Sequence, residues 1–153
     1  MTLADLVRPA RVVVPLRGAT LVDAGHVLLD RLVATGAIAN PERLLARADE
    51  GRPEDLVGMG DRAFLLHYRS DAVAELAVAL GTSAAPVSRE LGESDETQEA
   101  RIVLFVVAPP RQAPLYLQVV GAFARLLSRD EVVDAVVRAP SAEAVAALPA
   151  WGE

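Results

Sequence analysis

Apolar residues in the first part of the chain change from a short strand-like run to helical spacing. Residues 11–16 are rich in β-branched side chains and predict a short strand. Residues 20–35 place their apolar side chains on one helical face, and Gly36 is a suitable stop. A second helix is predicted after Asn40, which we interpret as its cap, with Pro41 at its first position.

The middle of the chain is dominated by strand patterns. Residues 62–68 and 74–80 each predict a strand. Residues 81–99 predict a long polar connection, and its acidic part, Glu90–Glu99, is expected to be a mobile surface loop. Residues 101–108 contain an uninterrupted apolar run, which predicts a strand covered on both faces.

Three helices are predicted after this strand. The first covers residues 115–127, the second runs from its cap Ser128 to about Arg138, and a short third helix is capped by Ser141. Strands and helices therefore interleave, with no internal repeat and no dividing linker. We predict an α/β fold: a single domain over residues 1–153 with a mixed β-sheet flanked by helices.

Composition restricts the class of protein. The chain has 153 residues, of which 52% are hydrophobic and 4% aromatic, so its core must be aliphatic. The net charge is −6 and no basic stretch follows a helix, which argues against nucleic-acid binding. There is no cysteine, so a disulfide framework and a thiolate metal site are both excluded.

The sequence shows neither a secretory signal at its first residues nor an apolar run of membrane-spanning length. The first residues lack a basic region followed by an apolar stretch, so they do not resemble a secretory signal. The longest apolar runs are far shorter than a membrane-spanning helix. We expect a cytoplasmic protein with no direct membrane insertion, whose contact with membranes, if it has any, is made through a partner.

The segment from Gly58 to Ala63 matches the spacing of a dinucleotide-binding fingerprint. That fingerprint must follow a strand and open a helix, whereas this segment follows a loop and opens a strand. We therefore expect no nucleotide or other cofactor. The glycines are interpreted as shaping a close approach to the strand.

Two histidines, His26 and His67, are the candidate chemical groups, and their spacing predicts no metal site. His26 lies inside the first predicted helix and is interpreted as an ordinary surface residue. His67 ends an apolar strand, at the sheet rim where α/β proteins place their chemistry. On pattern alone, a structural role for His67 is the more common explanation.

A family resemblance adds to this reading. Gly58-Met59-Gly60, an apolar strand, His67 and then the turn into Asp71-Ala72-Val73 resemble the active-site stretch of sugar-phosphotransferase-system (PTS) IIA domains of the mannitol–fructose–nitrogen-regulatory class, also called EIIA type 2. The later strands and helices follow in the family's order over nearly the whole chain. The resemblance implies an EIIA mannitol/fructose-like fold, with His67 as the phosphoryl acceptor.

Three residues depart from the family pattern around this histidine. Leu66 stands where the family usually has proline, Val57 where it has threonine, and Tyr116 where it has a second histidine. An arginine of the family's upstream loop corresponds to Arg47 or Arg52, which the sequence does not distinguish.

The resemblance also implies partners. In the family the donor is the phosphocarrier HPr, and the acceptor is a cysteine on a IIB domain. Nearby donors must hold the phosphoryl oxygens. Tyr116 can supply a hydrogen bond but no positive charge, and Arg69 is our candidate for that charge.

Three hypotheses remain open from the sequence. The first is a working phosphocarrier in sugar uptake or regulation, a phosphotransferase-type activity. The second is a degenerate interaction module of the same fold, which regulates a membrane transporter or an enzyme by binding and without phosphorylation. The third is an unrelated α/β enzyme, because a fold pattern alone does not establish function. Neither the sugar nor the regulatory target follows from the sequence.

Overall fold

A computed structural model describes residues 2–17, 20–90 and 97–152 of the chain. A five-stranded mixed sheet lies at its centre, in the order β1-β4-β5-β3-β2. The strands are β1 Val12–Val13, β2 Leu56–Gly58, β3 Phe64–Arg69, β4 Ala77–Glu90 and β5 Thr97–Ala108. β1 runs parallel to β4 and β3 runs parallel to β5, whereas the β4–β5 and β2–β3 pairs are antiparallel. The predicted mixed sheet is confirmed.

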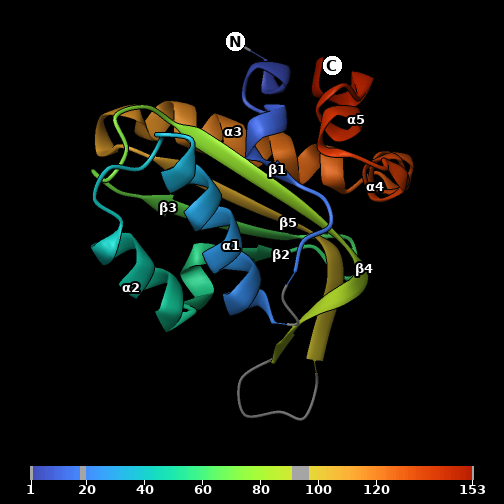
Figure 1. Cartoon of the computed structure of the whole chain (residues 1–153), viewed down its shortest axis with the longest axis horizontal. Coiled ribbons are helices and arrows are strands. Elements are labelled where there is room, and N and C mark those ends of the chain that lie inside the picture. The colour runs from blue at the N-terminus through green and yellow to red at the C-terminus, as the bar shows by residue number, and fades with distance from the viewer. Residues whose placement is uncertain (1, 18–19, 91–96, 153) are drawn as a thin grey trace.

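Helices cover both faces of this sheet (Figure 1). The α-helices are α1 Leu21–Ala34, α2 Glu42–Glu50, α3 Ala113–Leu127, α4 Asp130–Arg138 and α5 Ala142–Ala146. Short 3₁₀ turns connect several elements: η1 Leu3–Asp5, η2 Pro9–Arg11, η3 Pro53–Asp55, η4 Pro110–Gln112 and η5 Pro149–Gly152. Within the described residues, no helix is both long enough and apolar enough to cross a bilayer.

Two separate cores form because strand side chains alternate between the two faces of the sheet. α1 and α2 pack on one face, over side chains such as Phe64, Leu66 and Phe105. α3, α4 and α5 pack on the other face, over side chains such as Leu65 and Leu104. This arrangement confirms the predicted single α/β domain.

β5 is the central strand, as its apolar run predicted. Every residue from Ile102 to Ala108 is 0% exposed. The strand pairs with β4 on one side and with β3 on the other. An uninterrupted apolar run is needed here, because both faces of the strand are covered by helices.

The predicted polar connection over residues 81–99 is wrong. β4 continues to Glu90 and β5 already begins at Thr97, and the two strands pair through Ser88 and Glu99. A register shift between Thr82 and Val87 accommodates the intervening residues. The pairing uses backbone groups, so polar side chains did not reveal it. Residues 91–96 of the expected mobile loop lie outside the described residues.

Two predicted helix caps are also wrong, although both helices exist. α2 is preceded by Pro41 at the cap position instead of residue 40, without a side-chain hydrogen bond. Ser128 does not cap α4, whose cap residue is Arg129, because its hydroxyl donates back to the carbonyl of Arg125. Ser141 does cap α5, since its hydroxyl accepts from the backbone N–H of Ala144 at 3.1 Å.

Candidate functional site

His67 lies on β3, two residues before the end of that strand. Because side chains alternate along a strand, its neighbours Leu66 and Tyr68 point into the core under α1 and α2. His67 points to the other face, toward α3, and is half-buried. Leu66 therefore does not cover the imidazole, although it replaces the proline of the family pattern.

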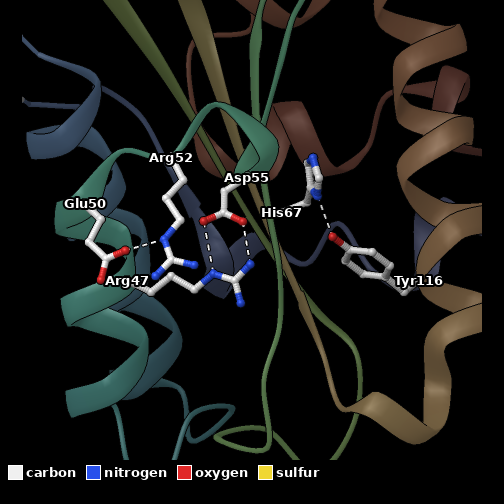
Figure 2. A network of polar contacts seen from close by, with 6 residues as sticks. All are labelled: Arg47, Glu50, Arg52, Asp55, His67 and Tyr116. Carbon is white, nitrogen blue, oxygen red and sulfur yellow. Dashed lines mark hydrogen bonds and ion pairs between the residues drawn. The ribbon is translucent and has the colours of Figure 1, made fainter.

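Tyr116 meets His67 from α3, as its place in the family pattern led us to expect. The Tyr116 hydroxyl is hydrogen-bonded to Nδ1 of His67, and the two ring centroids lie 5.8 Å apart (Figure 2). Tyr116 is only 7% exposed, so the helix packing holds its ring in place. Nε2 of His67 makes no hydrogen bond with the described residues, which leaves it as the unengaged ring nitrogen.

The surroundings keep both groups neutral near pH 7. Burial lowers the pKa of His67 and Arg47 lowers it further, while Asp55 opposes them. Burial also raises the pKa of the Tyr116 hydroxyl, so this group stays protonated. A neutral imidazole has a lone pair available for attack, and a neutral phenol can either donate or accept a hydrogen bond.

An ion pair between a partly exposed arginine and a buried aspartate lies near the histidine, on the side of α2 (Figure 2). Arg47 of α2 binds both carboxylate oxygens of Asp55, at 3.0 and 2.6 Å. Asp55 is 3% exposed, and the Arg47 guanidinium also lies 5.8 Å from the ring centroid of Tyr68. The charge of Arg47 is therefore largely neutralised before it acts on His67.

The two upstream arginines have different partners. Arg47 pairs with Asp55, and the charges of both act on the pKa of His67, whereas Arg52 pairs with Glu50 at a more exposed position. Sequence reasoning missed Asp55, because an acid in a Gly-, Pro- and acid-rich loop looks like a solvated residue. The available signal was its place directly before β2, where the chain returns to the sheet.

Arg69 shares the face of β3 that carries His67, because it lies two residues further along the strand. Its guanidinium carbon lies 5.9 Å from the ring centroid of Tyr116. The side chain is otherwise exposed. The structure thus brings His67, Tyr116 and Arg69 together at one end of β3.

The glycine segment forms the turn between β2 and β3, as expected for a segment that opens a strand. Gly60 has a positive φ of 64°, and its carbonyl accepts a hydrogen bond from Nε2 of Gln98 at 2.9 Å. A Cβ atom on Gly58 would lie 2.9 Å from the same Gln98 amide. Both glycines are therefore explained by the turn and by the close approach of β5.

His26 is remote from this group. It lies on α1, which covers the opposite face of the sheet, and it pairs with Asp49 of α2. The structure therefore keeps the two histidines apart, which agrees with the surface role expected for His26.

Comparisons with known proteins give the family. The model of the family described as phosphoenolpyruvate-dependent sugar phosphotransferase system, EIIA 2, matches residues 10–148. No curated protein matches the sequence.

Solved structures show the same fold. The nitrogen regulatory protein IIA-Ntr from Neisseria meningitidis is 15% identical, covering 94% of this chain and 96% of that chain, with a TM-score of 0.73. IIA mannitol from Escherichia coli is 20% identical, covering 90% of this chain and 94% of that chain, with a TM-score of 0.70. The Escherichia coli complex of enzyme IIAMTL with phosphorylated enzyme IIBMTL matches at 19% identity, over 89% of this chain and 91% of that chain, with a TM-score of 0.70. Because the family match covers most of its length, this chain belongs to the EIIA 2 family of the phosphoenolpyruvate-dependent sugar phosphotransferase system.

Proposed function

We propose that the chain is a phosphocarrier that accepts a phosphoryl group on Nε2 of His67 from HPr and passes it to a IIB partner. The observation that supports this most is the contact between Nδ1 of His67 and the Tyr116 hydroxyl. It engages one ring nitrogen and leaves the other unengaged on a half-buried side chain. We place this exchange in the cytoplasm.

The transfer needs a specific tautomer of the imidazole. When Nδ1–H donates to the Tyr116 hydroxyl oxygen, Nε2 carries the lone pair that attacks phosphorus. The new bond from Nε2 to phosphorus forms as the bond from phosphorus to the donor breaks, and the donor keeps that electron pair. In the second step a IIB thiolate attacks phosphorus, the bond to Nε2 breaks, and the lone pair returns to the ring.

Arg69 supplies positive charge in this proposal. The phosphoryl oxygens need donors or cations around them during transfer. Tyr116 is neutral, and the charge of Arg47 is engaged by Asp55. Arg69 is exposed beside Tyr116 and pairs with no acid among the described residues, so it is the cation best placed to contact these oxygens.

The partner surface lies around the same end of α3. Leu117 follows Tyr116 directly and is 69% exposed, an unusual position for a large apolar side chain. The IIAMTL–IIBMTL complex among the similar structures supports a IIB domain as one partner for this chain. HPr would approach the same surface, because both partners must reach His67.

The alternative function is regulation of a transporter or an enzyme by binding alone. Two observations favour it: Tyr116 replaces a residue able to carry positive charge, and Asp55 neutralises Arg47. An EIIA-fold module of this kind would bind its target through the partner surface around the exposed Leu117, without phosphorylation.

A labelling experiment separates the two functions. The purified chain is incubated with HPr, the general phosphotransferase enzyme and labelled phosphoenolpyruvate. We expect label on the wild-type chain, none on His67→Ala, and full labelling of the control His26→Ala, which removes the other histidine. A folded wild-type chain that takes no label would refute the carrier proposal and favour regulation by binding.

A further inference from the structure

A cavity of about 500 Å³ lies on the face of the sheet opposite His67. It is lined by residues of the first turn of α1, the loop after α2, and strands β2, β3 and β4. Leu21, Leu56 and Leu66 give it apolar walls. Its size falls within the range of small-molecule sites, roughly 300–1,000 Å³.

Tyr68 brings an unpaired polar group to this cavity. Its side chain lines the cavity and is 2% exposed, and its ring is held by Phe105 at a centroid distance of 5.0 Å. Its hydroxyl forms no hydrogen bond with any residue that the structure describes, although the side chain belongs to the cavity wall. A buried tyrosine usually pairs its hydroxyl, so an unpaired hydroxyl on a residue of the cavity wall is a donor available to a ligand.

Two arginine side chains bring positive charge to the same cavity. Arg89 of β4 and Arg52 after α2 both line it. Arg52 is paired with Glu50, whereas Arg89 forms no ion pair within the described part of the chain. None of the residues that line the cavity within the described part of the chain is acidic. An apolar cavity lined by cations and by hydroxyl groups, that of Tyr68 among them, is suited to a small organic anion.

We propose that this cavity binds a small amphipathic carboxylate. The apolar body of the ligand packs on Leu21, Leu56 and Leu66, the Tyr68 hydroxyl donates to one of its oxygen atoms, and Arg89 attracts its negative charge. Because the cavity opens on the face of β3 that His67 does not use, binding of this ligand does not depend on phosphoryl transfer.

Methyl NMR of the whole chain tests the proposal with 3-phenylpropionate as the probe and 3-phenylpropionamide as its uncharged match. At about 10 mM probe, an excess for a weak site, the carboxylate is expected to shift the methyl signals of Leu21, Leu56 and Leu66. The amide should bind roughly tenfold more weakly, because it lacks the charge that Arg89 attracts.

Three variants sharpen the test. Tyr68→Phe removes only an unpaired hydroxyl, so the fold is kept and the affinity for the carboxylate should fall roughly tenfold. Arg89→Gln should weaken binding of the carboxylate but not of the amide. Arg101→Gln, which removes an exposed arginine from β5 outside the cavity, should leave both affinities unchanged. Missing shifts at the three leucines, equal affinity for both probes, or wild-type affinity in Tyr68→Phe would overturn the proposal.

Discussion

The Tyr116 hydroxyl is bonded to Nδ1 of His67, although the two residues are 49 positions apart in the chain. The contact joins the end of a parallel strand pair to the first turns of α3. The contact engages Nδ1, and Nε2 makes no hydrogen bond with the described residues.

Phosphoryl transfer to this chain should therefore label Nε2 of His67. The position of the phosphoryl group can be read from the ¹⁵N chemical shifts of the ring in the phosphorylated protein. A phosphoryl group on Nδ1 would require the contact with Tyr116 to break, and would contradict the tautomer that we propose.

Replacement of the tyrosine should separate positioning from folding. Tyr116→Phe keeps the packed ring but removes the hydroxyl, and the rate of labelling should fall roughly tenfold because the tautomer is no longer held. Tyr116→His restores the residue of the family pattern and should label at least as fast as the wild-type chain. Equal rates in all three proteins would show that the contact with Nδ1 plays no part in transfer.

The pH dependence follows from the lowered pKa of His67. Burial, its main cause, disfavours the charged ring, so the midpoint of its NMR titration should lie below the ordinary value of 6.5. Because the unfolded chain then binds the proton first, the free energy of unfolding should fall as the pH drops from 6.5 to the folded pKa. His67→Gln should lose this part of the pH dependence, measured by urea unfolding at several pH values. A midpoint above 6.5 would contradict the burial seen for this ring.

Periodic apolar patterns predicted the parts of the fold that packing controls. The central strand β5 and helix α1 were found where their patterns placed them. Burial on both faces gives a strand an uninterrupted apolar run, and burial on one face gives a helix apolar residues at helical spacing. The far half of β4 was missed because backbone pairing holds it, whatever its side chains. The caps before α2 and α4 were mispredicted because a serine or asparagine side chain can form hydrogen bonds with several nearby backbone groups.

The candidate site was predictable only in part. His67 was found from its place at the end of a strand, and its approach to Tyr116 from the family resemblance. The pairing of Arg47 with Asp55 was not predictable, because it depends on how a loop returns to the sheet. The cavity beside Tyr68 was equally hidden, since four segments that lie apart in the sequence create it.

Arg69 should matter through its charge. Arg69→Gln removes the exposed guanidinium beside Tyr116, and we expect labelling to slow by roughly tenfold, because one charge-assisted contact to the phosphoryl oxygens is lost. Arg125→Gln is the matched control, since it removes an exposed charge from a later turn of α3. If both variants slow labelling equally, the effect belongs to the net charge and not to a contact at the site.

The stability of the chain should depend on Arg47 far more than on Arg52. Arg47→Gln leaves the Asp55 carboxylate, whose side chain is 4% exposed, without its bidentate partner. The half-open position of Arg47 lets water relieve part of the cost, so we expect a loss of about 2 kcal/mol in the free energy of unfolding. Arg52→Gln breaks an ion pair whose two side chains are 46% and 47% exposed, and it should cost less than about 1 kcal/mol. Urea unfolding followed by the fluorescence of Trp151, the single tryptophan, measures both values. If Asp55 is buried in solution, the double variant Arg47→Gln with Asp55→Asn should recover part of the lost stability, because it removes the unpaired carboxylate. Equal losses for Arg47→Gln and Arg52→Gln would instead mean that Asp55 is solvated.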